Sequence, residues 1–156
     1  MTDQTSPKSG ETKQEQLTRN LNELLQELRV TQTGAQILAG FLLTLPFSTR
    51  FEDLDDVQRK VYLFVFAGSV ITTALIVSPV AIHRTLFRQG ERKFLVEAAN
   101  QLARAGLVCL ALTISGVVWL IFDVVTARTT AFVAGGAALL FFGILWAGLP
   151  TVARNR

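Results

Sequence analysis

Residues 19–29 read Arg19-Asn-Leu-Asn-Glu-Leu-Leu-Gln-Glu-Leu-Arg29, and the chain continues without charge as Val30-Thr-Gln-Thr-Gly-Ala-Gln-Ile-Leu-Ala-Gly-Phe-Leu-Leu-Thr-Leu-Pro-Phe-Ser-Thr49. Leucine and small residues recur every three or four positions through both halves, at Leu17, Leu21, Leu24, Leu28, Thr31, Ala35, Leu38, Leu42 and Leu45. This spacing keeps one seam on one face of an α-helix. No proline or glycine interrupts residues 11–33. The stretch therefore predicts one continuous helix that enters a membrane near Arg29.

A second stripe follows an adjacent face of the same helix. It consists of the polar residues Asn22, Gln26, Arg29, Thr33 and Gln36, and Gly40, Leu43 and Phe47 continue it without polar groups. Gln36 lies about two helical turns beyond Arg29, inside the predicted span. Two interpretations of Gln36 stay open at this point. The amide either contacts a transported ion or substrate, or forms an interhelical hydrogen bond with a residue such as Ser78, His83 or Arg104.

Four charge-free runs of 18 to 25 residues decide the fold class. They cover residues 30–49, 61–82, 105–122 and 129–153. A helix needs about 20 residues to cross ~30 Å of hydrocarbon, so each run is long enough to span a membrane. The fold predicted is an all-α, four-helix transmembrane bundle with helices 1 and 3 extended into the cytoplasm, and with spans at about residues 30–49, 61–82, 105–126 and 129–150. A disordered polar tail over residues 1–16 and a basic tail over residues 151–156 flank the transmembrane domain of residues 17–150.

The distribution of lysine and arginine predicts the orientation. If both termini and the middle connection share one side, that side holds 11 of the 15 basic residues and the other side holds four, Arg50, Arg59, Lys60 and Arg128. Positive charge marks the cytoplasmic side of a membrane protein. We therefore expect a multi-pass protein of the plasma (inner) membrane with both termini in the cytoplasm. Tyr62 and Trp119 then lie toward the outer interface and Trp146 toward the inner one.

Asp123 is the only acidic residue within a predicted span. An intramembrane carboxylate is typical of a proton or cation site. The third helix reaches outer solvent near this position, however, and Arg128 follows in the short connection, so an interfacial ion pair is the alternative. The chain has one histidine and one cysteine, too few for the catalytic sites of most hydrolases and redox enzymes. No phosphate loop, dinucleotide fingerprint or zinc-protease motif is present in the sequence. We expect no enzyme activity, no cofactor, no metal ion and no nucleic-acid partner.

Two further sets of residues are candidates for binding. The exposed part of the first helix, with Arg19, Glu23, Leu24, Glu27 and Arg29, is a candidate docking helix for a partner protein. The basic run around the middle connection, with His83, Arg84, Arg88, Arg92 and Lys93, is expected to contact anionic lipid headgroups on the cytoplasmic side. Small residues of the fourth span, Gly143 and Ala147 among them, permit close helix contacts within the bundle or between copies.

The run from Arg19 to Gly34, the segment Phe41-Leu-Leu-Thr-Leu-Pro-Phe47 and the segment Ser78-Pro-Val-Ala-Ile-His-Arg84 resemble a family of small actinobacterial four-span membrane proteins of unknown function. The resemblance covers roughly residues 18 to 125. Some members carry the automatic label "sodium:proton antiporter", so the resemblance implies ion exchange as one function. Established antiporter folds are larger and place carboxylates at the midplane of inverted repeats, so the label requires several copies of this chain.

Two functions follow as expectations. The first is a non-enzymatic membrane protein that acts through helix–helix and cytoplasmic-helix contacts, as a homo-oligomer or as an accessory subunit of another membrane protein. The alternative is a small cation or proton transporter, for which Gln36 and Asp123 are the candidate path residues.

Overall fold

The computed structural model describes residues 13–86 and 92–148, and every regular element within these ranges is helical. Helix α1 spans Lys13–Thr44 and is followed by two short 3₁₀ segments, η1 (Leu45–Phe47) and η2 (Thr49–Phe51). Helix α2 spans Asp56–Leu86 and α3 spans Arg92–Val125. Helix α4 (Arg128–Gly143) continues into a π-helical turn, η3 (Ile144–Gly148). The predicted all-α fold with four long helices is confirmed.

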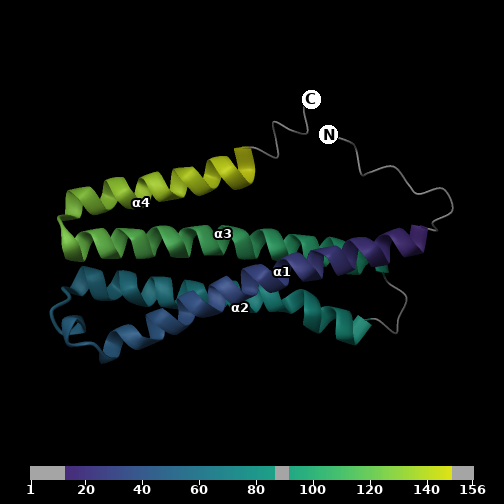
Figure 1. Ribbon diagram of the computed structural model, residues 1–156, viewed down its shortest axis with the longest axis horizontal. Coiled ribbons are helices and arrows are strands. Elements are labelled where there is room, and N and C mark those ends of the chain that lie inside the picture. The colour runs from purple at the N-terminus through teal and green to yellow at the C-terminus, as the bar shows by residue number, and fades with distance from the viewer. Residues whose placement is uncertain (1–12, 87–91, 149–156) are drawn as a thin grey trace.

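Helices α2 and α3 form the central antiparallel pair (Figure 1). Helix α1 crosses this pair and packs on both of its members, whereas α4 packs on α3 alone among the described helices. The α1–α2 and α3–α4 connections lie together at one end of the molecule, which we call the loop end (Figure 1). The start of α1, the end of α2 and the start of α3 lie at the opposite end, which we call the terminal end.

Within the described residues, four helices are long and apolar enough to cross a membrane. Their apolar segments are Glu23–Phe47, Asp56–Ile82, Glu97–Val125 and Arg128–Trp146. Large apolar side chains cover the outer surface of all four, as the hydrocarbon of a bilayer requires. The chain is a membrane protein.

Two helix boundaries differ from those expected. Helix α1 begins at Lys13 rather than after residue 16, because the polar residues before Leu17 are good helix formers and include no proline or glycine after Gly10. Helix α2 runs on to Leu86 and includes His83 and Arg84, which the basic run predicts in the middle connection. No proline or glycine lies between Pro79 and Gly90 to end it sooner.

The loop-end half of the molecule has the main apolar core. Tyr62, Val65, Trp119, Leu120 and Ala131 are buried there together with Leu42 of α1. The Tyr62 hydroxyl donates a 2.9 Å hydrogen bond to the carbonyl oxygen of Leu42, which joins α1 to α2. Tyr62 and Trp119 therefore lie toward the expected end but are core residues. They do not form a belt at the membrane surface, because the neighbouring helices cover both rings.

Glycines let α2 and α3 approach each other closely, midway between the loop end and the terminal end. A Cβ atom on Gly68 would lie 2.5 Å from Thr113 Oγ1, and one on Gly116 would overlap Val65 Cγ1. The Cys109 thiol donates to the carbonyl oxygen of Gly68 at 3.4 Å across the same contact. Small residues let transmembrane backbones approach closely, and here they do so inside the chain.

Candidate functional site

Four polar side chains meet at the loop end, and we call them the loop-end network: Asp55, Gln58, Asp123 and Arg128. Arg128 Nε donates to Asp123 Oδ1 at 3.1 Å, and its Nη2 donates to Asp123 Oδ2 at 3.1 Å. The same Nη2 donates to Asp55 Oδ2 at 2.6 Å. Gln58 Nε2 completes the set by donating to Asp123 Oδ2 at 2.8 Å. The network joins the starts of α2 and α4 to the end of α3.

Local sequence builds the α2 side of this network. Asp55 Oδ1 accepts hydrogen bonds from the backbone N–H groups of Val57 and Gln58, both at 2.8 Å. Gln58 Oε1 accepts the backbone N–H of Asp55 at 3.0 Å. This reciprocal pattern is a capping box, as the three-residue spacing predicts. Because the cap uses the amide oxygen of Gln58, its amide nitrogen is left to point at Asp123.

Arg128 forms ion pairs with both carboxylates of the network. The Asp123 side chain is 2% exposed, whereas the Arg128 side chain is 43% exposed and reaches toward solvent. The backbone N–H of Gln58 and the Arg128 guanidinium together hold the pKa of the exposed Asp55 carboxyl below its ordinary value, against an opposing effect of desolvation. Asp123 thus has an arginine partner and three donated hydrogen bonds. These contacts fasten the end of α3 to the starts of α2 and α4.

The guanidinium of Arg128 has an apolar neighbour as well. Its central carbon lies 5.8 Å from the centre of the Trp119 ring, within the range of a cation–π contact. Trp119 in turn packs edge-on against Phe132 of α4 at a ring separation of 5.6 Å. The ion pair is therefore continuous with the α3–α4 contact that holds α4 in place.

A family model described as "Family of unknown function (DUF6328)" matches residues 10–150. The chain belongs to this family. No match is found among the curated proteins or among the solved structures. The match covers all four helices and the whole loop-end network.

Gln36, the second candidate path residue, is not part of the loop-end network. It lies on the exposed side of α1 and makes no hydrogen bond within the described chain. Ser78, one of the three partners considered for it, instead donates to the carbonyl oxygen of Ala74 in its own helix at 2.7 Å. Among the side chains that the structure describes, Gln36 does not form the interhelical hydrogen bond considered from sequence.

The candidate docking helix at the start of α1 divides into two faces. Leu24 lies partly buried, against Ala99 of α3 on one side and near Leu28, Ile76 and Ala103 on the other. It therefore belongs to an intramolecular seam and is not available to a partner. Arg19, Glu23, Glu27 and Arg29 lie on the exposed side, with Arg19 Nε 3.8 Å from Glu23 Oε1.

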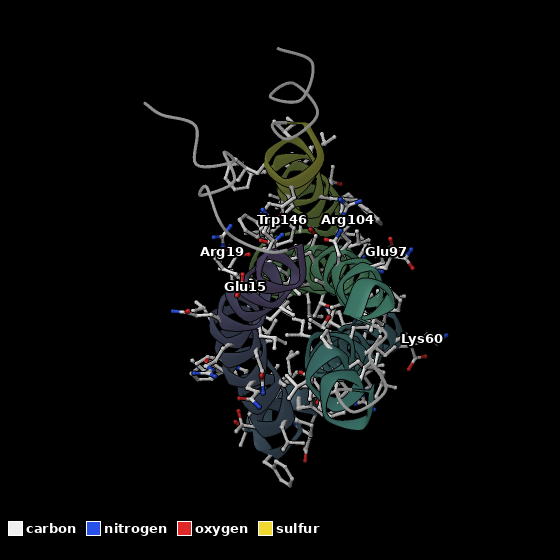
Figure 2. All side chains as sticks on the ribbon, turned by 90° about the vertical axis from the view of Figure 1, so that its right-hand side faces the viewer. Glu15, Arg19, Lys60, Glu97, Arg104 and Trp146 are labelled. Carbon is white, nitrogen blue, oxygen red and sulfur yellow. The ribbon has the colours of Figure 1, made fainter. Side chains whose placement is uncertain are left out.

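Charged side chains surround the terminal end, among them Glu15 and Arg19 on α1 and Glu97 and Arg104 on α3 (Figure 2). Of the residues expected to contact lipid headgroups, His83 and Arg84 lie in the last turn of α2, and Arg92 and Lys93 begin α3. Arg88 lies outside the described residues. The helix positions place these four residues at the terminal end, where Arg104 is also exposed.

Sequence reasoning missed the hydroxyl groups buried between the central helices. Ser69, Thr72 and Thr113 are almost fully buried at mid-height. Ser69 donates to the carbonyl oxygen of Phe66, and Thr113 donates to that of Cys109, so both are satisfied within their own helices. The signal in the sequence is the small size of these residues, because Ser and Thr fill the same close helix contacts as Gly and Ala. In the described residues, no group of three or more metal-ligating side chains comes together.

Proposed function

We propose that the protein is a non-enzymatic membrane protein that works through helix–helix contacts in the bilayer, as part of an assembly of defined composition. The observation that carries this proposal is the open packing of the outer helices. Helix α4 rests on α3 alone among the described helices. Two of its glycines, Gly136 and Gly143, have open space where a Cβ would be. Glycines on an outer transmembrane surface suit close contact with a further helix.

The interior supports the same proposal. Of the described residues, Asp123 is the one buried carboxylate, and Arg128 neutralises it at the loop end. At mid-height, the contact between α2 and α3 is filled by Val65, Ser69, Thr72 and Thr113. A helix pair packed in this way is a scaffold for outer surfaces. The chain is proposed to lie in the plasma membrane with its terminal end cytoplasmic, where Arg19, Arg29 and Arg104 face anionic headgroups.

The alternative function, exchange of sodium ions and protons, has one observation in its favour. The hydroxyl of Thr72 is buried midway along α2 and has no hydrogen-bond partner among the described residues. Hydroxyl oxygens can bind a sodium ion, but such a site also needs carboxylates or carbonyls near it. Asp123 is remote from Thr72 along the bundle. The observation identifies Thr72 as a residue to test, but it does not establish a continuous path for an ion.

Native mass spectrometry of the full chain, extracted with its surrounding lipid, tests the proposal. We expect a complex of fixed stoichiometry that persists on dilution into lipid. The proposal would be refuted if the protein stayed monomeric, without any bound partner, at every density of protein in the lipid. Proteoliposomes loaded with a sodium or proton gradient test the alternative, in which Thr72→Val should abolish any flux.

The orientation has its own test. In a Cys109→Ala background, Ser48→Cys places a thiol at the loop end and Arg19→Cys places one at the terminal end. A maleimide that cannot cross the membrane should label the thiol at position 48 in intact cells. It should label the thiol at position 19 only after lysis, and the opposite pattern would reverse the orientation.

A further inference from the structure

The outer side of α1 carries a polar stripe that no described helix covers. The stripe runs at alternating spacings of three and four through Gln26, Arg29, Thr33, Gln36, Gly40 and Leu43 of α1 and ends at Phe47 of η1, and all seven residues are exposed. The buried residues of α1, Leu28, Ala35 and Leu42, lie on an adjacent side of the helix, about a quarter to a third of a turn from Gln36. Figure 2 shows α1 flanking the central pair with its outer side free of any other helix.

Gln36 is the residue of this stripe whose exposure to lipid is energetically unfavourable. It lies about 10 Å beyond Arg29 along the helix, at a depth where the bilayer contains no water. An amide in hydrocarbon has nothing to bond to, and burying a polar group without a partner is unfavourable. Thr33 avoids the problem because its hydroxyl donates to the carbonyl oxygen of Arg29 at 3.0 Å. Gln36 makes no such bond in the described chain, so its partner must come from outside α1–α4.

We propose that the stripe Thr33–Gln36–Gly40–Leu43 is the contact surface for a second copy of this chain, with the two α1 helices parallel. This inference rests on the proposed function and names its partner. Copies of one chain insert in the same direction, so their α1 helices are parallel by necessity. A glutamine amide is both donor and acceptor, so Gln36 in each copy satisfies Gln36 in the other across a two-fold axis.

Two features next to Gln36 fit the same contact. Gly40 lies one turn further along the helix, and a Cβ atom added to it would meet nothing within 4 Å, so the two backbones can approach where the amides meet. The spacing of the stripe is that of the seam between two parallel helices in a left-handed coiled coil. Arg29 falls at the membrane boundary, where its long side chain reaches water and avoids its counterpart in the other copy.

Disulfide crosslinking in membranes tests the surface directly. In a Cys109→Ala background, which removes the one native thiol, Thr33→Cys and Leu43→Cys should each give an oxidised dimer of the full chain. Val70→Cys is the matched control, because Val70 is 52% exposed on α2, at a depth similar to that of Thr33, and lies away from the stripe. The inference is overturned if Val70→Cys crosslinks as well as the stripe variants, or if the stripe thiols bond only to proteins of other mass.

The amide is tested by resonance energy transfer between labelled copies in vesicles at increasing ratios of lipid to protein. Gln36→Leu should weaken dimerisation about five- to thirty-fold, the range expected for a polar contact between transmembrane helices. Gln36→Asn should keep most of the affinity, because it keeps the amide. The thermal midpoint of dilute, monomeric protein should not fall in Gln36→Leu, since the Gln36 amide bonds to nothing within one chain.

The two proposals fail in different ways. A native complex of fixed stoichiometry without α1 crosslinks would leave the proposed function standing and refute the α1 contact. A monomer under all conditions would refute both. Equal dimerisation of the Gln36→Leu variant and the unaltered chain would show that the stripe does not depend on its amide, and would also overturn the inference.

Discussion

The contact between Gly116 and Val65 gives the sharpest test of the α2–α3 packing. A methyl group at Gly116 would overlap Val65 Cγ1, and Val65 is fully buried. A β-branched valine in a helix has one strongly preferred rotamer, so it cannot turn aside at low cost. Gly116→Ala must therefore separate the two helices or strain Val65. Overpacking of this kind costs about 1–3 kcal/mol.

Helix propensity acts in the opposite direction and must be removed from the comparison. Alanine is favoured over glycine inside a helix by about 1 kcal/mol. Gly136→Ala in α4 is the matched control, because nothing lies within 4 Å of its added methyl group. Both variants gain the same propensity, so the difference between them measures the overlap alone. A difference of about 1–3 kcal/mol corresponds to roughly 2–12 °C in the thermal midpoint of a chain of this size.

Thermal unfolding followed by circular dichroism in one detergent measures this difference. The Gly116→Ala variant should unfold at the lower temperature, and Gly136→Ala should unfold at or above the midpoint of the unaltered chain. Adding Val65→Ala should cancel most of the penalty of Gly116→Ala, which a double-mutant cycle detects as coupling. Equal midpoints for the two glycine variants, or additive effects in the cycle, would refute the close approach of α2 and α3.

Three further predictions concern the loop-end network and the α1 seam. Arg128→Ala should lower the thermal midpoint more than Arg50→Ala at the same end, because removal of Arg128 leaves the buried Asp123 carboxylate without its cation. The lowered pKa of Asp55 stabilises the fold above the unfolded-state value of about 4, and this contribution should disappear as pH falls below it. Asp55→Asn, which keeps the cap, should therefore lose less stability than the unaltered chain as pH falls through that window. Leu24→Asp should destabilise the monomer by about 2–4 kcal/mol in an unfolding titration, whereas Glu27→Ala on the exposed side should not.

The helices themselves were predictable because their signals are local. Charge-free runs of spanning length identify the four helices without knowledge of any contact. The Asp55–Gln58 capping box predicts the start of α2, and α2 begins at Asp56. The short α3–α4 connection likewise predicts that Arg128 can reach Asp123, and the two side chains are paired.

The network as a whole was not predictable, because its other bonds join residues far apart in sequence. Gln58 and Asp123 are 65 positions apart, and Asp55 and Arg128 are 73 apart. Their contact depends on how α2 and α3 align along their length. That alignment is set by the glycine contacts at Gly68 and Gly116, and a sequence shows where glycines lie without showing what they meet.

The sequence could not show which of the two α1 stripes packs inward, and the physical reason is different. Both stripes repeat at spacings of three and four, so periodicity identifies two faces without saying which one packs inward. In water the apolar face turns inward, but lipid is as apolar as a protein core, and this criterion fails inside a membrane. Close packing decides instead: Ala35 fits against the central pair, and the bulkier amide of Gln36 does not.

The outward direction of Gln36 also constrains the transport alternative. A carrier that works as a single chain needs its polar groups inside the bundle, where they can replace the water around an ion. Here the polar stripe of α1 lies outside, and the buried carboxylate is paired at one end. An ion path that uses Thr33 and Gln36 must therefore run between copies, in an assembly joined through α1. Loss of the α1 contact in Gln36→Leu should then abolish flux together with dimerisation, so flux that persists in the monomeric variant would contradict a path between copies.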